Sequence, residues 1–146
     1  MVRITAPKPK EQELPVERIN PDTMHQNPAF TQMVVLPADA RIAIIGGQNA
    51  VDKDGKIVGR GDIAKQTEQA LKNLVTCLET VNASVEDLVQ MKIYIVAGQD
   101  LRAAFGAWMQ VWGQRSNPPA VTGFFVAGLA NPDYLIEIEA TAVLAG

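Results

Sequence analysis

The stretch Leu135-Ile136-Glu137-Ile138-Glu139-Ala140 alternates apolar and acidic side chains, and the alternation extends over residues 134–143. A period of two residues is typical of a strand that buries one of its faces. The buried face would carry the isoleucines and alanines, and the other face would carry Glu137, Glu139 and Thr141. The stretch therefore predicts a half-buried strand with two carboxylates on its open face.

Upstream of this strand the chain contains further strand-like runs. Residues 121–127 are continuously apolar apart from Thr122 and Gly123, which is typical of a strand covered on both faces. Residues 89–95 alternate and predict a half-buried strand. Residues 31–36 and 41–46 predict two more strands joined by a turn. In residues 53–56, the pair Asp54-Gly55 suits a type I′ hairpin turn.

Two segments predict helices, each preceded by an aspartate suited to cap the helix N-terminus. The apolar stripe after Asp62 comprises Thr67, Ala70, Leu71, Leu74, Leu78 and Val81. The stripe after Asp100 comprises Leu101, Ala104, Phe105, Trp108, Val111 and Trp112. We expect Cys77, beside the first stripe, to be a small buried hydrophobe. Trp112 fits a core position, and Trp108 fits either the core or the lining of a cleft.

The predicted order of elements bears on assembly. Residues 1–28 are rich in proline and predict an extended N-terminal arm, and residues 29–146 predict one domain. Two helices can cover only one face of the predicted sheet. The other face mixes apolar and polar side chains and needs a partner, so we expect a homo-oligomer with facing sheets.

Composition excludes several classes of function. The chain has 146 residues, a net charge of -3, one cysteine and one histidine. The acidic balance argues against nucleic acid and against an anionic membrane surface as partners. One cysteine allows no intrachain disulfide, and a Cys/His zinc site cannot be built within the chain. No apolar run has the length of a membrane span or a signal peptide, so we expect a cytoplasmic protein.

Few residues in the sequence are candidates for chemistry. Glu137 and Glu139 lie two apart on one strand face, where they either form a solvated surface or place one carboxylate in a cleft to orient a water. No dinucleotide-binding, Walker or nucleophile-elbow motif is present. We therefore expect no cofactor and no metal.

Several segments together resemble the Rid family, also called YjgF/RidA-like or endoribonuclease L-PSP proteins. No single segment is specific, but the ordered set extends from about residue 16 to 143. The matching segments are Asn27-Pro28-Ala29-Phe30-Thr31-Gln32, Ile44-Ile45-Gly46-Gly47-Gln48, residues 54–59, 66–74 and 87–94, Pro119-Ala120, and Ile136-Glu137-Ile138-Glu139-Ala140.

The resemblance implies an α+β, chorismate-mutase-like (RidA-like) fold, with a single mixed sheet and two helices packed on one face. It also implies a homotrimer that holds a small-molecule ligand in each of three clefts between subunits. Glu137 matches the family carboxylate that positions the hydrolytic water, so it is the candidate catalytic residue. The candidate substrate-binding residues are Phe30, Gly46, Gln48, Trp108, Val121 and Thr122.

At four matched positions the chain departs from the deaminating members of the family. Val121 stands in place of the arginine that clamps a substrate carboxylate, and Gly46 in place of a serine. Phe30 lacks a phenol hydroxyl, and Phe105 replaces an asparagine. Valine offers no charge-assisted grip, and an unpaired buried anion is costly, which argues against 2-imino acids as substrates. Arg102 or Arg115 could replace the missing arginine.

Three functions remain open at this point. The first is a Rid-like hydrolase or deaminase that acts on a small, relatively apolar metabolite through Glu137. The second is a trimer that binds a small apolar ligand without turnover. The third is an endoribonuclease, which the net charge of -3 and the lack of a basic stripe disfavour.

Overall fold

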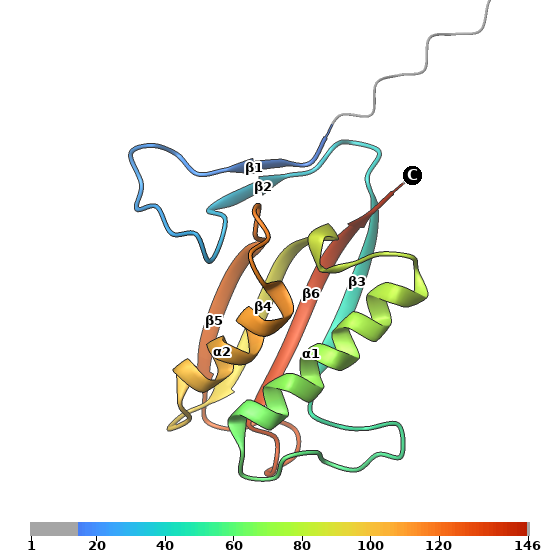
Figure 1. The fold of residues 1–146 in the computed structure, drawn as a ribbon, viewed down its shortest axis with the longest axis vertical. Helices are drawn as coiled ribbons and strands as arrows, with labels where there is room; N and C mark the ends of the chain where they lie inside the picture. Colours follow the sequence, from blue (N-terminus) through green and yellow to red (C-terminus); the bar gives the residue numbers. More distant parts are fainter. Residues whose placement is uncertain (1–14, 146) are drawn as a thin grey trace, which may run out of the picture.

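In the computed structural model, which describes residues 15–145, four strands form one mixed sheet and two helices cover one of its faces (Figure 1). The sheet order is β3-β6-β4-β5, with β4 and β5 parallel and the other neighbours antiparallel. The elements are β1 (Glu17–Ile19), β2 (Met33–Val35), β3 (Arg41–Gln48), α1 (Ile63–Thr80), the 3₁₀ turn η1 (Val85–Asp87), β4 (Leu88–Val96), α2 (Leu101–Trp112), β5 (Ala120–Val126) and β6 (Ile136–Leu144). The predicted α+β architecture is confirmed.

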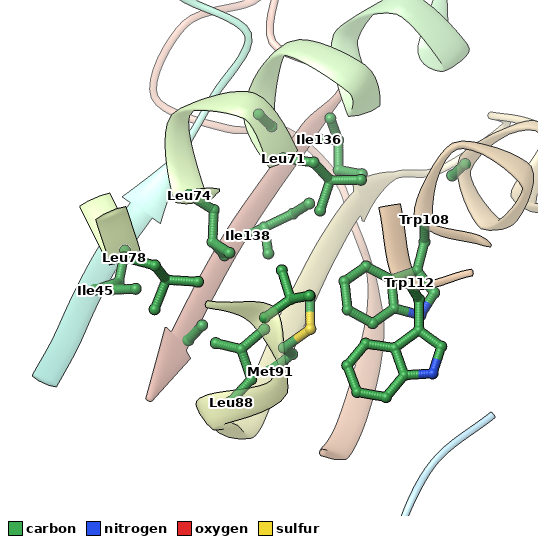
Figure 2. Packing of buried hydrophobic residues seen from close by; sticks show 14 of the residues in the cluster. Ile45, Leu71, Leu74, Leu78, Leu88, Met91, Trp108, Trp112, Ile136 and Ile138 are labelled. Carbon is green, nitrogen blue, oxygen red and sulfur yellow. The ribbon is translucent and has the colours of Figure 1, made fainter. Parts of the chain in front are cut away.

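Strand β6 lies in the middle of the sheet, paired with β3 on one side and with β4 on the other. Its burial alternates along its whole length, as its sequence predicts: Ile136 and Ile138 are buried beneath the helices, and Glu137 lies on the opposite, outer face. Figure 2 shows leucines of α1 directed toward these isoleucines, with Met91 of β4 beside them. The core therefore occupies the layer between β6, β4 and the two helices.

The aspartates begin both helices as predicted. Asp62 accepts a hydrogen bond from the Lys65 backbone N–H, and Asp100 accepts one from Arg102. Two predictions along the α1 stripe were wrong. Val81 is the residue after the last helical turn and is exposed, and Cys77 is exposed because it lies one position away from the buried side of α1.

Strand β5 differs from the prediction of a doubly covered strand. It forms one edge of the sheet, and Phe124 and Phe125 are largely exposed. The second helix also leaves part of its apolar face open, because Leu101 and Phe105 are each about half exposed while Trp108 and Trp112 are buried. The two tryptophan rings stack with their centroids 5.5 Å apart.

The first strands form a separate two-stranded ribbon beyond one end of the main sheet (Figure 1). Strand β2 falls within the strand predicted over residues 31–36, but its partner is β1, from the residues assigned to the extended arm. The main sheet thus begins with β3.

The hairpin turn around Gly55 is not type I′, because Asp54 lacks the positive φ which that turn requires. Gly55 alone has a positive φ, and its N–H donates to the Asp52 carbonyl oxygen at 3.0 Å. The Asp52 carboxylate also accepts from the backbone N–H groups of Asp54 and Lys56, which favours this alternative turn.

Candidate functional site

A cavity of about 230 Å³ opens between α1, α2 and the helix-covered face of the sheet. Val121 and Gly123 of β5 form part of its wall, α2 contributes Phe105 and Trp108, and Phe30 comes from the loop before β2. No ionisable side chain lines it. Its only hydroxyl, Thr67 Oγ1, donates to the Ile63 carbonyl oxygen at 2.7 Å. The cavity is therefore apolar and electrically neutral.

The local structure explains why these side chains meet. Val121 pairs in register with Met91, which places it on the helix face of β5, and Gly123 has no side chain to fill the space beside it. On α2, Phe105 lies one helical turn before Trp108 and therefore on the same side. Trp108 is 7% exposed and Phe105 is 50% exposed, so the tryptophan forms a wall of the cavity and the phenylalanine its rim.

Phe30 is fixed through its neighbour Thr31, which is buried. The Thr31 backbone N–H donates to the Pro119 carbonyl oxygen at 3.0 Å, and the Thr31 hydroxyl donates to the carbonyl oxygen of Pro118. These prolines immediately precede β5, so the same segment that carries Val121 also positions Phe30. This coupling could not be read from the sequence, because 87 residues separate Thr31 from Pro118.

Arg18 of β1 ties the ribbon to this region. Its guanidinium donates to the carbonyl oxygens of Asn117 and Leu88, both at 2.8 Å. Burial lowers the pKa of the Arg18 guanidinium, and the charge of Asp87 partly offsets that effect. The ribbon is thus attached to the start of β4 and to the loop that precedes β5.

The outer face of the sheet carries the acidic residues. Tyr94 donates its hydroxyl to Glu139 Oε1 at 2.7 Å, Lys92 Nζ lies 3.8 Å from the same oxygen, and the Tyr94 ring stacks on Phe124. The hydrogen bond to Glu139 is the main cause that raises the pKa of Tyr94, with smaller contributions from burial and from the charges of Glu139 and Glu137. The Glu139 carboxylate therefore already has a hydrogen-bond partner and a cation within the sheet.

Glu137 is different, because within residues 15–145 its carboxylate makes no hydrogen bond or ion pair. It lies against Gly47, at a bulge where β3 shifts register between Ile45 and Gln48. A Cβ on Gly47 would come within 2.6 Å of Glu137 Oε1. Gly47 thus provides the room in which the Glu137 carboxylate lies. The sequence displays the glycine pair but does not reveal this contact.

The predicted site residues divide between different parts of the single chain. Phe30, Trp108 and Val121 line the cavity. Thr122 and Glu137 lie on the outer face, since Thr122 pairs with Lys92 and Glu137 with Tyr94. Gly46 and Gln48 lie at the β3 edge, where Gln48 Nε2 donates to the Gly46 carbonyl oxygen at 3.0 Å.

Leu101 and Gly123, which also line the cavity, were not predicted as site residues. The helical stripe contained the signal for Leu101. For Gly123 the only signal was the position two residues after Val121, on the same strand face.

Neither alternative arginine reaches the cavity. Arg102 lies near Asp100, with Nε 3.7 Å from Oδ1, and its side chain is 95% exposed. Arg115 donates to Glu86 Oε1 at 3.1 Å and to the Trp112 carbonyl oxygen at 2.8 Å. The cavity therefore has no cationic group for a carboxylate within the described chain.

Two further observations limit the chemistry. Residues 15–145 contain no cluster of three or more His, Cys, Asp or Glu side chains that could hold a metal ion. Among the helices of this part of the chain, none is long and apolar enough to cross a membrane.

The chain belongs to the endoribonuclease L-PSP family, the YjgF/RidA family, whose model matches residues 24–144. The fold is the chorismate-mutase-like fold of that family. A RutC family protein of Pyrococcus horikoshii is 35% identical over 67% of this chain and 75% of its own length.

Solved structures agree with this assignment. The Rid family protein YyfB of Yersinia pestis, described as of unknown function, has a TM-score of 0.78 and 34% identity over 88% of this chain and 98% of its own. The YjgF gene product of E. coli has a TM-score of 0.63 and 29% identity, over 70% of this chain and 80% of its own.

Proposed function

We propose that the protein is a homotrimer that binds a small, relatively apolar metabolite in clefts between its subunits. The observation that carries this proposal is the neutral cavity lined by Phe30, Trp108 and Val121. Ligand sites are concave and mostly apolar, with few polar groups. The cavity has this character, and its lining includes the position where deaminating relatives would have an arginine.

The division of the site residues supports the oligomeric part of the proposal. The cavity reaches the β5 edge of the sheet, whereas Gly46, Gln48 and the Gly47–Glu137 contact lie at or beside the β3 edge. Two half-sites at opposite edges meet when subunits associate head to tail, and such contacts close into a ring when the rotation permits. A trimeric ring would place Glu137 of one subunit at the cavity of the next.

In such a cleft Glu137 is the group available for chemistry. A carboxylate without a partner in its own subunit can orient a water or accept a proton, as hydrolysis or deamination requires. The substrates would not be 2-imino acids, because nothing in the cavity pairs with a carboxylate. Glu139 is less suited to this role, since Tyr94 and Lys92 already contact it.

A second function, ligand binding without turnover, is favoured by one observation. Every side chain that lines the cavity is non-ionisable, and Glu137 lies on the other face of the same sheet. Ribonuclease activity finds no support in the net charge of -3.

Crystals of the assembled protein soaked with small neutral compounds would test the proposal. We expect ligand density in the cavity, with the neighbouring subunit's Glu137 beside it. A cavity filled by side chains of the neighbouring subunit would overturn the binding function.

Turnover is tested with the compounds that bind. Glu137→Gln keeps the shape and removes the charge, so it should abolish any hydrolysis while the trimer stays intact. If hydrolysis persists, or if the trimer dissociates, Glu137 is not the catalytic carboxylate. Binding by both proteins with no hydrolysis by either would establish the second function.

A further inference from the structure

The chemistry of the cavity restricts its ligand further than apolar character alone. We propose that the ligand is an aromatic compound without an anionic group, of about nine non-hydrogen atoms, an inference that rests on the proposed binding function. It follows from three properties of the cavity: its volume, its lack of charge and its aromatic lining.

Volume sets the size of the ligand. An engineered cavity of about 150 Å³ binds benzene, which has six non-hydrogen atoms, or about 25 Å³ for each atom. At the same ratio, a cavity of 230 Å³ accommodates about nine such atoms. A single substituted ring or a small fused pair of rings has this size.

The lining disfavours anionic ligands. A carboxylate that enters the cavity loses its water and finds no cationic side chain among the lining residues. The Thr67 hydroxyl already donates its hydrogen to the backbone of α1. An anionic ligand would therefore bind far more weakly than a neutral one of the same shape.

The aromatic lining favours a planar ring over a saturated one. Phe30, Phe105 and Trp108 approach the cavity from the loop before β2 and from α2. Trp108 is held by its stack on Trp112, whose indole N–H donates to the Arg115 carbonyl oxygen at 2.9 Å. A preorganised aromatic wall loses little entropy when it packs against a second ring, and aromatic pairs gain energy beyond their buried area.

Phe105 adds an observation that points to an occupant. Half of its surface is exposed at the rim of the cavity, although it belongs to the apolar stripe of α2. A ring bound between Phe105 and Trp108 would cover this exposed surface. An aromatic ligand would thus bury surface of Phe105 that is exposed in the single chain.

Three compounds of matched size separate these properties: benzyl alcohol, its saturated analogue cyclohexylmethanol, and the anion benzoate. Ligand-observed NMR titration of the full chain gives the affinity of each. We expect benzyl alcohol to bind about tenfold more tightly than cyclohexylmethanol. Benzoate should bind at least about 100-fold more weakly than benzyl alcohol.

The outcomes distinguish this inference from the proposed function. Equal binding of benzoate and benzyl alcohol, or of the aromatic and saturated alcohols, overturns the inference and leaves ligand binding intact. If none of the three binds, the inference and the binding function both fail.

Two variants with a matched control locate the effect. Val121→Arg should reverse the preference in favour of benzoate, because it supplies a cation inside the cavity. Gln110→Arg adds the same charge at an exposed position of α2 outside the cavity and should leave all three affinities unchanged. Phe105→Leu, at the rim, should reduce the preference for the aromatic alcohol about threefold. An unchanged preference in both cavity variants would place the binding elsewhere and contradict the inference.

Discussion

The two faces of the four-stranded sheet are built from the same strands, yet they differ in charge and in burial. On the helix face, Ile136 and Ile138 are buried beside a neutral cavity. On the outer face, Glu137 and Glu139 share the surface with Lys92 and Tyr94. Within one subunit the candidate catalytic carboxylate, Glu137, is thus separated from the candidate binding cavity by the thickness of the sheet. A site that uses both must be completed by a second subunit.

The largest effect expected from this difference concerns imine hydrolysis. With Val121 in the cavity in place of an arginine, we expect ammonia release from 2-iminopropionate or 2-iminobutyrate at least about 100-fold slower than for an arginine-bearing relative. A coupled ammonia assay on both proteins measures this. A rate equal to that of the relative would show that the neutral cavity does not exclude 2-imino acids as substrates. Val121→Arg alone should not restore the activity, because Gly46 and Phe105 differ as well.

The next largest effect is expected when an isoleucine is replaced by alanine on each face of the sheet. Ile138 is 2% exposed on the helix face, so Ile138→Ala should lower the free energy of unfolding by about 2–5 kcal/mol. Ile44 is 83% exposed on the outer face, so Ile44→Ala should weaken assembly and leave the fold of each subunit intact. Urea denaturation at several protein concentrations separates the two effects. Similar concentration-independent losses in both variants would contradict the outer face being an interface.

The glycine pair of β3 provides a sharper comparison at the outer face. Gly47→Ala brings a Cβ against the Glu137 carboxylate and should displace it, at a cost of about 1 kcal/mol because that side chain can move. Gly46→Ala meets nothing within 4 Å and serves as the control. Crystal structures and denaturation curves of both variants check this. If Glu137 keeps its position in Gly47→Ala, the absence of a side chain at Gly47 is not what gives the Glu137 carboxylate its room.

The smallest effect is a pH dependence confined to the outer face. Because the pKa of Tyr94 is raised by its hydrogen bond to Glu139, the contribution of this pair to stability is present below the ordinary tyrosine pKa. It is lost as the pH rises through the raised pKa. Spectrophotometric titration should show Tyr94 ionising at lower pH in Glu139→Gln, with no change in Val121→Ala on the other face. An unaltered titration in Glu139→Gln would contradict the hydrogen bond as the main cause.

The sequence predicted those features that local patterns determine. The alternation in β6 and the aspartate caps of both helices are confirmed because each depends on neighbours a few residues apart. Resemblance to relatives added the topology of the sheet. Cys77 was misplaced because it lies one position away from the buried side of the helix, and Val81 because α1 ends at Thr80, one residue before it.

Other features depend on contacts between distant segments. The apolar sequence of β5 is typical both of a strand inside a sheet that is covered on both faces and of an edge strand that is partly exposed in the single chain. The sequence therefore did not predict that β5 lies at the edge of the sheet. The Thr31–Pro118 hydrogen bond and the Gly47–Glu137 contact join segments about 90 residues apart. The two-residue period of each strand assigns Val121 to one face of β5 and Glu137 to one face of β6. Only the pairing of both strands with β4 shows that these two residues lie on opposite faces of the sheet.

We propose that the cavity of one subunit is completed by the outer-face residues of another. The most direct measurement is the mass of the purified protein in solution, determined by multi-angle light scattering at micromolar concentration. We expect three times the mass of the chain. A monomer mass would contradict it, because Glu137 would then have no cavity to face and the proposed cleft could not form.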